Sequence, residues 1–388
     1  MTRLDRVALR EIRLPLKEPF RISSGTVTER RICLLELRDS DGLSTWAECV
    51  AGEQPNYSSE TIDTAWVALR EFILPRAFET PIDDPASVYA ALSRNVCGHN
   101  MAKAAVEMGC WALAALRDGV SLARRVAGGR EGTRDAIVTG ISLGIQATPA
   151  DLVARAVRAR ADGFRKIKLK VAPGMDVAFV AAVREALGPD VALMADANSS
   201  YTPADAAHLK ELDRFGLIMI EQPLGRDDLV RHAALQRELR TPLCLDESIT
   251  DVDRAEDMIA LGSGRIINIK PGRVGGFAQA VAIHDLAQQH GIPVWCGGML
   301  ESGVGRAYNV ALASLPNFSL PSDLSPSARY WERDVVTPEW TMDADGLVHV
   351  PRDVPGIGVA VDVDRVDYLT VRRKVFTPHA AAAVRAAA

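Results

Sequence analysis

Residues 164–176 read FRKIKLKVAPGMD, with lysine at every second position from Lys166 to Lys170. Side chains alternate between the two faces of a β-strand, so the three lysines share one face and the aliphatic residues between them share the other. The aliphatic face predicts burial against a hydrophobic layer. The lysine face has two interpretations: it meets water at a sheet edge, where lysine discourages aggregation, or it meets a functional site.

Short apolar runs of this kind recur along the chain, with helix-like segments between them. The runs are DAIVTGISLG (135–144), KIKLKV (166–171), ALMADAN (192–198), LIMIEQP (217–223), LCLDES (243–248), RIINIKP (265–271) and PVWCGG (293–298). Several intervening segments open on Thr or Asp and end on Gly, as capped helices do. The alternation predicts an α/β fold, a modified (β/α)8-type barrel of parallel strands. A doubly wound sheet is the alternative, although no glycine-rich phosphate loop follows the first strand.

The chain outside this alternating region predicts a second unit, of α+β type. Residues 1–130 contain alternating strands with a turn at Asp41-Gly42, followed by two helical stretches. Residues 331–388 show no strand–helix alternation, and we expect them to return to the N-terminal part. We therefore expect a capping domain made of both ends of the chain around a barrel at 131–330.

The composition predicts a globular cytoplasmic protein. The 388 residues are 48% hydrophobic with a formal net charge of −5, which allows one or two domains and argues against nucleic-acid binding. We expect neither a signal peptide nor a membrane span. The six cysteines lack CxxC spacing, so buried thiols are expected instead of disulfides or a zinc site. The alanine-rich stretch 379–388 predicts a fraying end.

Five consecutive strand runs each end in a charged residue. Lys170, Asp196, Glu221, Asp246 and Lys270 follow one another at intervals of 26, 25, 25 and 24 residues, one strand–helix unit each. This spacing predicts that all five side chains lie at the C-terminal mouth of the barrel, where barrel active sites form. A single Asp after a strand is often only a helix N-cap, and Asp196 and Asp246 keep that alternative. Five charged residues in register favour a site.

Three carboxylates at one barrel mouth predict a divalent-cation site. Crowded carboxylates repel one another and resist ionisation, and a cation relieves that repulsion. Hard oxygen ligands favour Mg²⁺, with Mn²⁺ as the alternative, over zinc. A lysine near a cation and another lysine is expected to have a lowered pKa and to act as a base. We expect Lys168 and Lys170 to face this site, and Lys166 is assigned no role.

The motifs resemble a known family. KIKLK, DAN, IEQP, LDES and NIKPGRVGG, in this order, resemble the muconate-lactonising subgroup of the enolase superfamily, whose sites use a lysine base, Mg²⁺ and an enediolate. More closely, PFRISSG, PNYSSE and GIPVWCGGMLESGVGRAYNVALASLPNFSLPSD are similar to the N-succinylamino acid racemase/o-succinylbenzoate synthase family. The likeness covers residues 18–360, broadly.

The resemblance implies a role for each matching residue. The implied set is Lys168, Lys170 and Lys270 as catalytic residues, Asp196, Glu221 and Asp246 as Mg²⁺ ligands, and Asn198, Glu247, Arg273, Ser142, Met299, Glu301, Phe20 and Tyr57 in the pocket or supporting the metal shell. Lys170 would be the base on one substrate face, Lys270 would lie opposite, and Lys168 would tune Lys170. Met299 keeps plain packing as an alternative, and Ser142 a hydrogen bond at a strand end.

The resemblance further implies a reaction class. A small-molecule carboxylate would lose its α-proton through an enediolate, leading to o-succinylbenzoate by dehydration on the menaquinone route, or to racemised N-succinyl- or N-acylamino acids. A muconate-type cycloisomerase and a non-catalytic barrel are the alternatives. The family also implies a homo-oligomer, with no membrane partner. Related dipeptide epimerases carry Asp-x-Asp after the last strand, whereas LPSDLSPS has Asp323 alone, which argues against dipeptide substrates.

Overall fold

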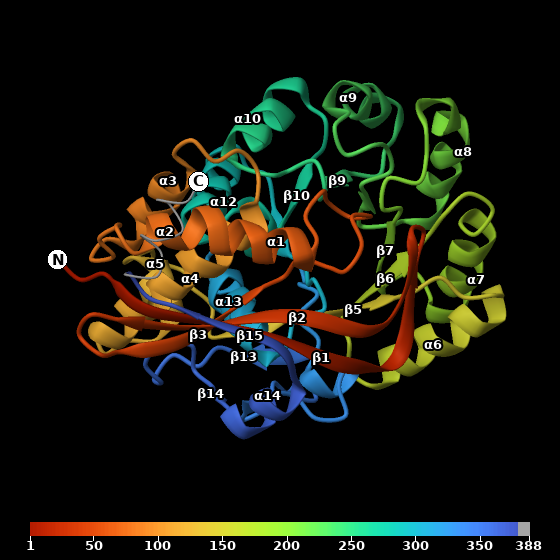
Figure 1. The fold of residues 1–388 in the computed structure, drawn as a ribbon. Coiled ribbons are helices and arrows are strands. Elements are labelled where there is room, and N and C mark those ends of the chain that lie inside the picture. Colours follow the sequence, from red (N-terminus) through yellow and green to blue (C-terminus); the bar gives the residue numbers. More distant parts are fainter. Residues whose placement is uncertain (379–388) are drawn as a thin grey trace.

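A seven-stranded sheet forms the centre of the molecule (Figure 1). The computed structural model describes residues 1–378, and the fraying predicted for 379–388 lies outside them. The strands, all parallel to their neighbours, are β5 (Gly140–Leu143), β6 (Lys166–Lys170), β7 (Ala192–Asp196), β8 (Ile220–Glu221), β9 (Leu243–Leu245), β10 (Ile266–Ile269) and β11 (Val294–Cys296). Their spatial order follows the chain without the reversal that a doubly wound sheet requires. The predicted barrel-type sheet is confirmed.

Residues 320–323 fill the eighth position of the ring without forming a regular strand. On one side the Asp323 N–H donates to the Cys296 carbonyl oxygen at 2.9 Å. On the other side the Gly140 N–H donates to the Ser322 carbonyl oxygen at 2.7 Å, and the Ser322 N–H donates to Val138 at 2.9 Å. The segment therefore joins the two edges of the sheet and closes the barrel.

Helices connect the barrel strands. They are α6 (Pro149–Ala161), α7 (Val177–Leu187), α8 (Ala206–Leu209), α9 (Leu229–Glu238), α10 (Val252–Leu261), α11 (Pro271–Val274), α12 (Phe277–Gln289) and α13 (Gly303–Ala313). Side chains such as Thr148 and Asp251 cap their N-termini, as the sequence predicts. The helical segment between β7 and β8 is less regular than the others, because α8 is flanked by 3-10 turns. Arg184 of α7 donates hydrogen bonds to the carbonyl oxygens of residues 215 and 216 at the end of that segment.

No helix within residues 1–378 combines the length and apolarity needed to cross a bilayer.

Strand β6 is buried on both faces, which decides between the two interpretations of its lysines. Ile167 and Leu169 pack in the outer core with apolar residues of α6 and α7. Lys166, Lys168 and Lys170 are 0%, 4% and 9% exposed, and they contact charged and aromatic side chains from other strands of the ring. The lysine face therefore meets the barrel interior, and not bulk water.

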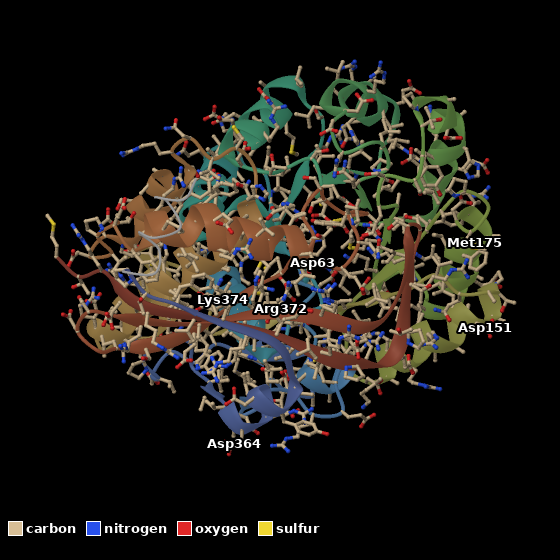
Figure 2. All side chains as sticks on the ribbon, in the orientation of Figure 1. Asp63, Asp151, Met175, Asp364, Arg372 and Lys374 are labelled. Atoms are coloured by element: carbon tan, nitrogen blue, oxygen red, sulfur yellow. The ribbon has the colours of Figure 1, made fainter. Side chains whose placement is uncertain are left out.

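An antiparallel sheet with helices forms the cap. Its order is β15-β1-β2-β3, and its elements are β1 (Leu4–Ile22), β2 (Gly25–Asp39), β3 (Ser44–Cys49), α1 (Ile62–Ala68), α2 (Leu74–Ala77), α3 (Val88–Ser93), α4 (Asn100–Arg117), α5 (Leu122–Ala127) and β15 (Thr370–Phe376). Because β15 pairs with β1, both ends of the chain build the cap, and the predicted fold class is confirmed. Arg372 of β15 also donates to Asp63 of α1 at 3.0 Å (Figure 2). The domain limits at 130/131 and 330/331 stay predictions.

The C-terminal segment also touches the barrel. It contains β12 (Val336–Thr337), β13 (Leu347–His349), β14 (Ala360–Val361) and α14 (Val363–Leu369). Strand β13 pairs with β4 (Ala136–Val138), so the first predicted run splits into β4 and β5.

Five of the six cysteines are buried as free thiols, whereas Cys97 is exposed.

The cap contacts the barrel at its mouth through the β1–β2 hairpin and α4. The Ile145 N–H donates to the Arg21 carbonyl oxygen at 2.9 Å, and the hairpin rises toward β6 and β7 in Figure 1. Glu107 of α4 accepts the N–H groups of Phe277 and Ala278 at 2.8 and 2.9 Å, which caps α12 from another domain. Gly276 permits this approach, because its φ is +117° and a Cβ would lie 2.1 Å from a Glu107 oxygen.

His232 of α9 fixes the loop after β8 in its neutral form. Its Nε2 accepts the Leu224 N–H at 3.2 Å, so the proton belongs on Nδ1, which lies 2.5 Å from the Asp228 carbonyl oxygen. Burial lowers the pKa of His232. A histidine whose pKa is lower in the folded state loses its contribution to stability as the pH falls through the unfolded value of about 6.5.

We expect acid destabilisation that depends on His232. The free energy of unfolding should fall between about pH 7.5 and about pH 5.5, and should fall less in His232→Gln, because glutamine takes up no proton. Urea titrations at both pH values measure this difference. His290 is exposed, so His290→Gln should keep the wild-type difference. The same pH difference in His232→Gln as in the wild type would contradict the assignment.

Candidate active site

The five charged strand ends meet at the mouth of the barrel. Lys170 lies opposite Asp196 in the sheet, and Asp196 lies opposite Glu221. Lys170 Nζ is 2.6 Å from Asp196 Oδ2, and Lys270 Nζ is 2.7 Å from Asp246 Oδ2. The arrangement is a row of three carboxylates with one lysine at each end.

Lys168 lies among the carboxylates. Its Nζ is 3.3 Å from an oxygen of both Asp196 and Glu221, and 2.6 Å from Asp323 Oδ2. The other Asp323 oxygen is 3.1 Å from Lys166 Nζ, which also lies 3.7 Å from the ring centre of Trp295. Lys166 thus belongs to a buried ion pair over an indole face, a cation–π contact.

Carboxylates and lysines set one another's pKa values. Burial, and then the charge of Asp196, raise the pKa of Glu221 to about 8. Burial alone would raise the pKa of Asp196, but Lys170 and Lys168 hold it well below its usual range. Burial acts to lower the pKa of Lys270 and of Lys168, but the nearby carboxylates, Asp246 and Asp323 foremost, raise both above the usual value. The lowered pKa expected for a lysine beside a bound cation stays a prediction; here the ammonium groups of Lys168 and Lys270 each lie directly against a carboxylate.

The donor chemistry of the row fits a divalent cation. Within residues 1–378 no group of three or more His, Cys, Asp and Glu side chains is arranged to hold a metal ion. The reason is that lysine ammonium groups take oxygens of Asp196, Glu221 and Asp246. The three carboxylates are nevertheless buried hard donors on neighbouring strands, and the repulsion that raises the pKa of Glu221 is what a cation relieves.

Two amides that sequence reasoning missed hold the row in place. Asn268 Nδ2 donates to Glu221 Oε1 at 2.7 Å, and its Oδ1 accepts the Gly297 N–H at 2.8 Å. Gln222 Oε1 accepts the Asp246 N–H at 3.0 Å. Both residues could have been found from the sequence. Asn268 shares a strand face with Lys270, two positions further on, and Gln222 directly follows Glu221.

Tyr57 and Arg273 lie around Asp246. The Tyr57 hydroxyl donates to Asp246 Oδ1 at 2.8 Å, and the Arg273 guanidinium pairs with the same oxygen. Arg273 also donates to the Asn268 carbonyl oxygen at 2.6 Å. A loop of the cap and the α11 turn therefore both contact the carboxylate row.

Asn198 connects Lys170 to Glu247. Its Oδ1 lies 2.6 Å from Lys170 Nζ, and its Nδ2 donates to Glu247 Oε1 at 2.9 Å. Burial, and then the charge of Asp246, raise the pKa of Glu247 to about 7. Both residues thus lie beside the carboxylate row, where the resemblance places them.

A cavity of about 560 Å³ opens between the cap and the barrel mouth. The residues of the predicted site on its wall are Phe20, Tyr57, Lys170, Asn198, Lys270 and Met299. Glu247 and Arg273 line a neighbouring cavity on the other side of Tyr57. Neither Ser142 nor Glu301 lies on the wall of the 560 Å³ cavity. Ser142 is buried on β5, and Glu301 is buried and accepts the N–H of Met299, a wall residue, at 2.7 Å.

Two family models match the chain, one in its N-terminal part and one in its barrel and C-terminal part. Residues 5–126 match the mandelate racemase/muconate lactonizing enzyme N-terminal domain, and residues 151–366 match the enolase C-terminal domain-like family. Fold and site together define an enzyme of the enolase superfamily. The chain belongs to its mandelate racemase/muconate lactonizing enzyme family.

Individual relatives narrow the class of enzyme further. An o-succinylbenzoate synthase from Geobacillus kaustophilus is 50% identical over 376 residues, 96% of this chain and 97% of the relative. An N-succinylamino acid racemase from an Amycolatopsis species is 44% identical over 96% and 98% of the two chains. A solved enolase-superfamily structure from Listeria innocua has a TM-score of 0.92 at 38% identity, covering 97% of this chain and all of the other. The predicted resemblance is confirmed. Enzymes of this type use a divalent metal and act on small molecules.

Proposed function

We propose that this enzyme removes the α-proton of a carboxylate substrate, as an o-succinylbenzoate synthase, an N-succinylamino acid racemase, or both. The observation that carries the proposal is the placement of Lys170 and Lys270 at opposite ends of one carboxylate row, on the wall of one cavity. A substrate bound between them presents one face to each lysine. Relatives with both activities match the chain over nearly its full length.

Asp196, Glu221 and Asp246 would hold Mg²⁺, with Mn²⁺ as the alternative. The cation supplies positive charge that stabilises the enediolate left when the α-proton departs. Asn268 orients Glu221, and Asn198 and the neighbouring Glu247 steady the side of the row next to Lys170.

Each lysine has a separate task. Lys170 takes the α-proton onto Nζ, and Lys168 lies beside it against the same Asp196 oxygen. In racemisation Lys270 returns a proton to the opposite face. In dehydration Lys170 passes the proton it has taken to the β-hydroxyl, which leaves as water, and the ring becomes aromatic. Phe20 and Tyr57 cover the cavity and exclude water.

Proton NMR of N-succinyl-phenylalanine in D₂O tests the proposal. We expect the α-proton signal of both enantiomers to disappear with enzyme and Mg²⁺, and to persist with excess chelator. Formation of o-succinylbenzoate from its cyclohexadiene precursor, followed by absorbance, tests the synthase activity in parallel. No exchange from either enantiomer would exclude the racemase activity. Failure of both assays would contradict the proposal and favour a muconate-type cycloisomerase.

A further inference from the structure

Arg30, on β2, is a buried cation without an ion pair among the described residues. The residue is only 6% exposed. Its Nη2 donates to the Val50 carbonyl oxygen at 3.2 Å, while its Nε is buried without a hydrogen-bond partner in the described part of the chain. Glu48, Glu301 and Glu53, which lies on the same cavity wall, act on it only through their fields, with no hydrogen bond to the guanidinium. A guanidinium has five donors, so most of its capacity is unused.

The other cations on the same cavity wall have carboxylate partners. Lys170 pairs with Asp196, and Lys270 pairs with Asp246. Arg31, the neighbour of Arg30 on the strand, lies 2.7 Å from Glu11. Among these wall residues of the described chain, Arg30 is the cation left without an ion pair.

The carboxylate of Glu48 is already engaged elsewhere. It accepts the Ser302 hydroxyl at 2.6 Å and the Gly305 N–H at 3.1 Å, and so caps α13. Glu301 accepts from the Met299 backbone through Oε1, while its Oε2 lies 3.8 Å from Arg306 and has no hydrogen-bond partner among the described residues. Neither carboxylate is placed to bind the guanidinium of Arg30 directly.

The anchor of Arg30 lies against the segment that carries Lys270. Val50, whose carbonyl oxygen holds the guanidinium, packs on Gly272, where a Cβ would lie 2.5 Å from Val50 Cγ2. Gly272 is two residues after Lys270. The wall of the cavity therefore continues from the lysine pair to Arg30.

Desolvating a charge without a partner is costly, and an incoming anion offsets that cost. Burial lowers the pKa of Arg30, against the fields of Glu48 and Glu301, which raise it. The planar guanidinium matches a carboxylate in two parallel hydrogen bonds. The chemistry that completes this position is a second carboxylate on the substrate.

We propose that Arg30 binds the distal carboxylate of a dicarboxylate substrate whose first carboxylate is held between Lys170 and Lys270. The inference rests on the proposed function, whose substrates carry a succinyl group, and assigns the residue that binds the free carboxylate of that group. It makes Arg30 the residue that selects a succinyl group over an acyl group with an uncharged end. An Arg30 that only balanced the charges of Glu48 and Glu301 would affect both kinds of substrate alike.

Paired ligands test this selectivity. In α-proton exchange, Arg30→Met should lower kcat/KM for N-succinyl-phenylalanine by about 10- to 100-fold, mainly through KM, because a charge-assisted hydrogen bond is lost. The value for N-butanoyl-phenylalanine, which lacks the distal carboxylate, should change by less than about threefold, since that contact never formed. Arg30→Lys should recover part of the loss. The exposed Arg38 on the same strand gives the control Arg38→Met, which should behave as the wild type. Equal losses on both ligands would overturn the inference.

Calorimetric binding of o-succinylbenzoate and of 2-butanoylbenzoate, which has a single carboxylate, needs no turnover. The wild type should bind the dicarboxylate more tightly, and Arg30→Met should remove the difference. Equal wild-type affinity for the two ligands would overturn the inference even if Arg30→Met failed to fold. Selective binding without α-proton exchange would exclude the racemase activity and leave the role of Arg30 intact. Binding of neither ligand would overturn both the inference and the proposed function.

Discussion

Lys170→Ala is expected to stop proton abstraction from the substrate face next to Lys170 while leaving the protein folded. A positioned general base contributes about 10²- to 10⁴-fold to a rate, so synthase turnover, and α-proton exchange from the enantiomer that faces Lys170, should each fall by about that factor. The Lys170 ammonium is 2.6 Å from both Asp196 and Asn198, and no other residue occupies its place at this end of the row. Steady-state formation of o-succinylbenzoate and NMR exchange measure the loss.

The fold should survive this change, because Asp196 does not become an unpaired buried charge. Lys168 Nζ remains 3.3 Å from the same Asp196 oxygen. Thermal melting and calorimetric Mg²⁺ binding should therefore resemble those of the wild type. Lys210 is exposed, and Lys210→Ala serves as the control for removal of a lysine. Synthase activity retained in Lys170→Ala would exclude Lys170 as the base.

The barrel and its charged row could be predicted because their signals are local and repeated. Each strand run is short, apolar and followed by a helix pattern, and the interval between charged residues equals one such unit. Lys170, Asp196 and Glu221 therefore fall on adjacent strand ends in the structure. No single motif was needed for this prediction.

Asp323 could not be placed in this way. It follows an irregular segment that closes the ring through backbone hydrogen bonds to both edge strands. No strand pattern marks that segment, so the sequence does not indicate that Asp323 meets Lys166 and Lys168. The raised pKa of Lys168 depends on this contact, which the sequence does not reveal.

Arg30 shows the same limit at another position. In the sequence it is one of two adjacent arginines on a polar stretch of strand. Both line the cavity, but Arg31 pairs with Glu11 and Asp63, whereas the hydrogen bond of Arg30 goes to the Val50 carbonyl oxygen. Which of the two lacks a partner depends on the packing of the cap on the barrel, and that is a property of the tertiary structure alone.

Lys270→Ala is expected to separate the two enantiomers of an N-succinylamino acid. Lys170 and Lys270 lie at opposite ends of the carboxylate row, so each α-proton faces only one of them. In the variant, the enantiomer that faces Lys170 should still exchange its α-proton in D₂O, because one lysine both removes and returns it. Exchange from the other enantiomer should fall by about 10²- to 10⁴-fold, and racemisation should be lost in both directions.

NMR of each pure enantiomer, with chiral chromatography of the products, measures the asymmetry. Lys170→Ala should give the mirror result, which excludes a general loss of activity as the explanation. Lys270 also pairs with Asp246, but Arg273 contacts that carboxylate too, so the row keeps a cation at this end. The asymmetry therefore reports on proton transfer and not on a disrupted site. Equal loss from both enantiomers, or no loss from either, would contradict a mechanism in which the two lysines act on opposite substrate faces.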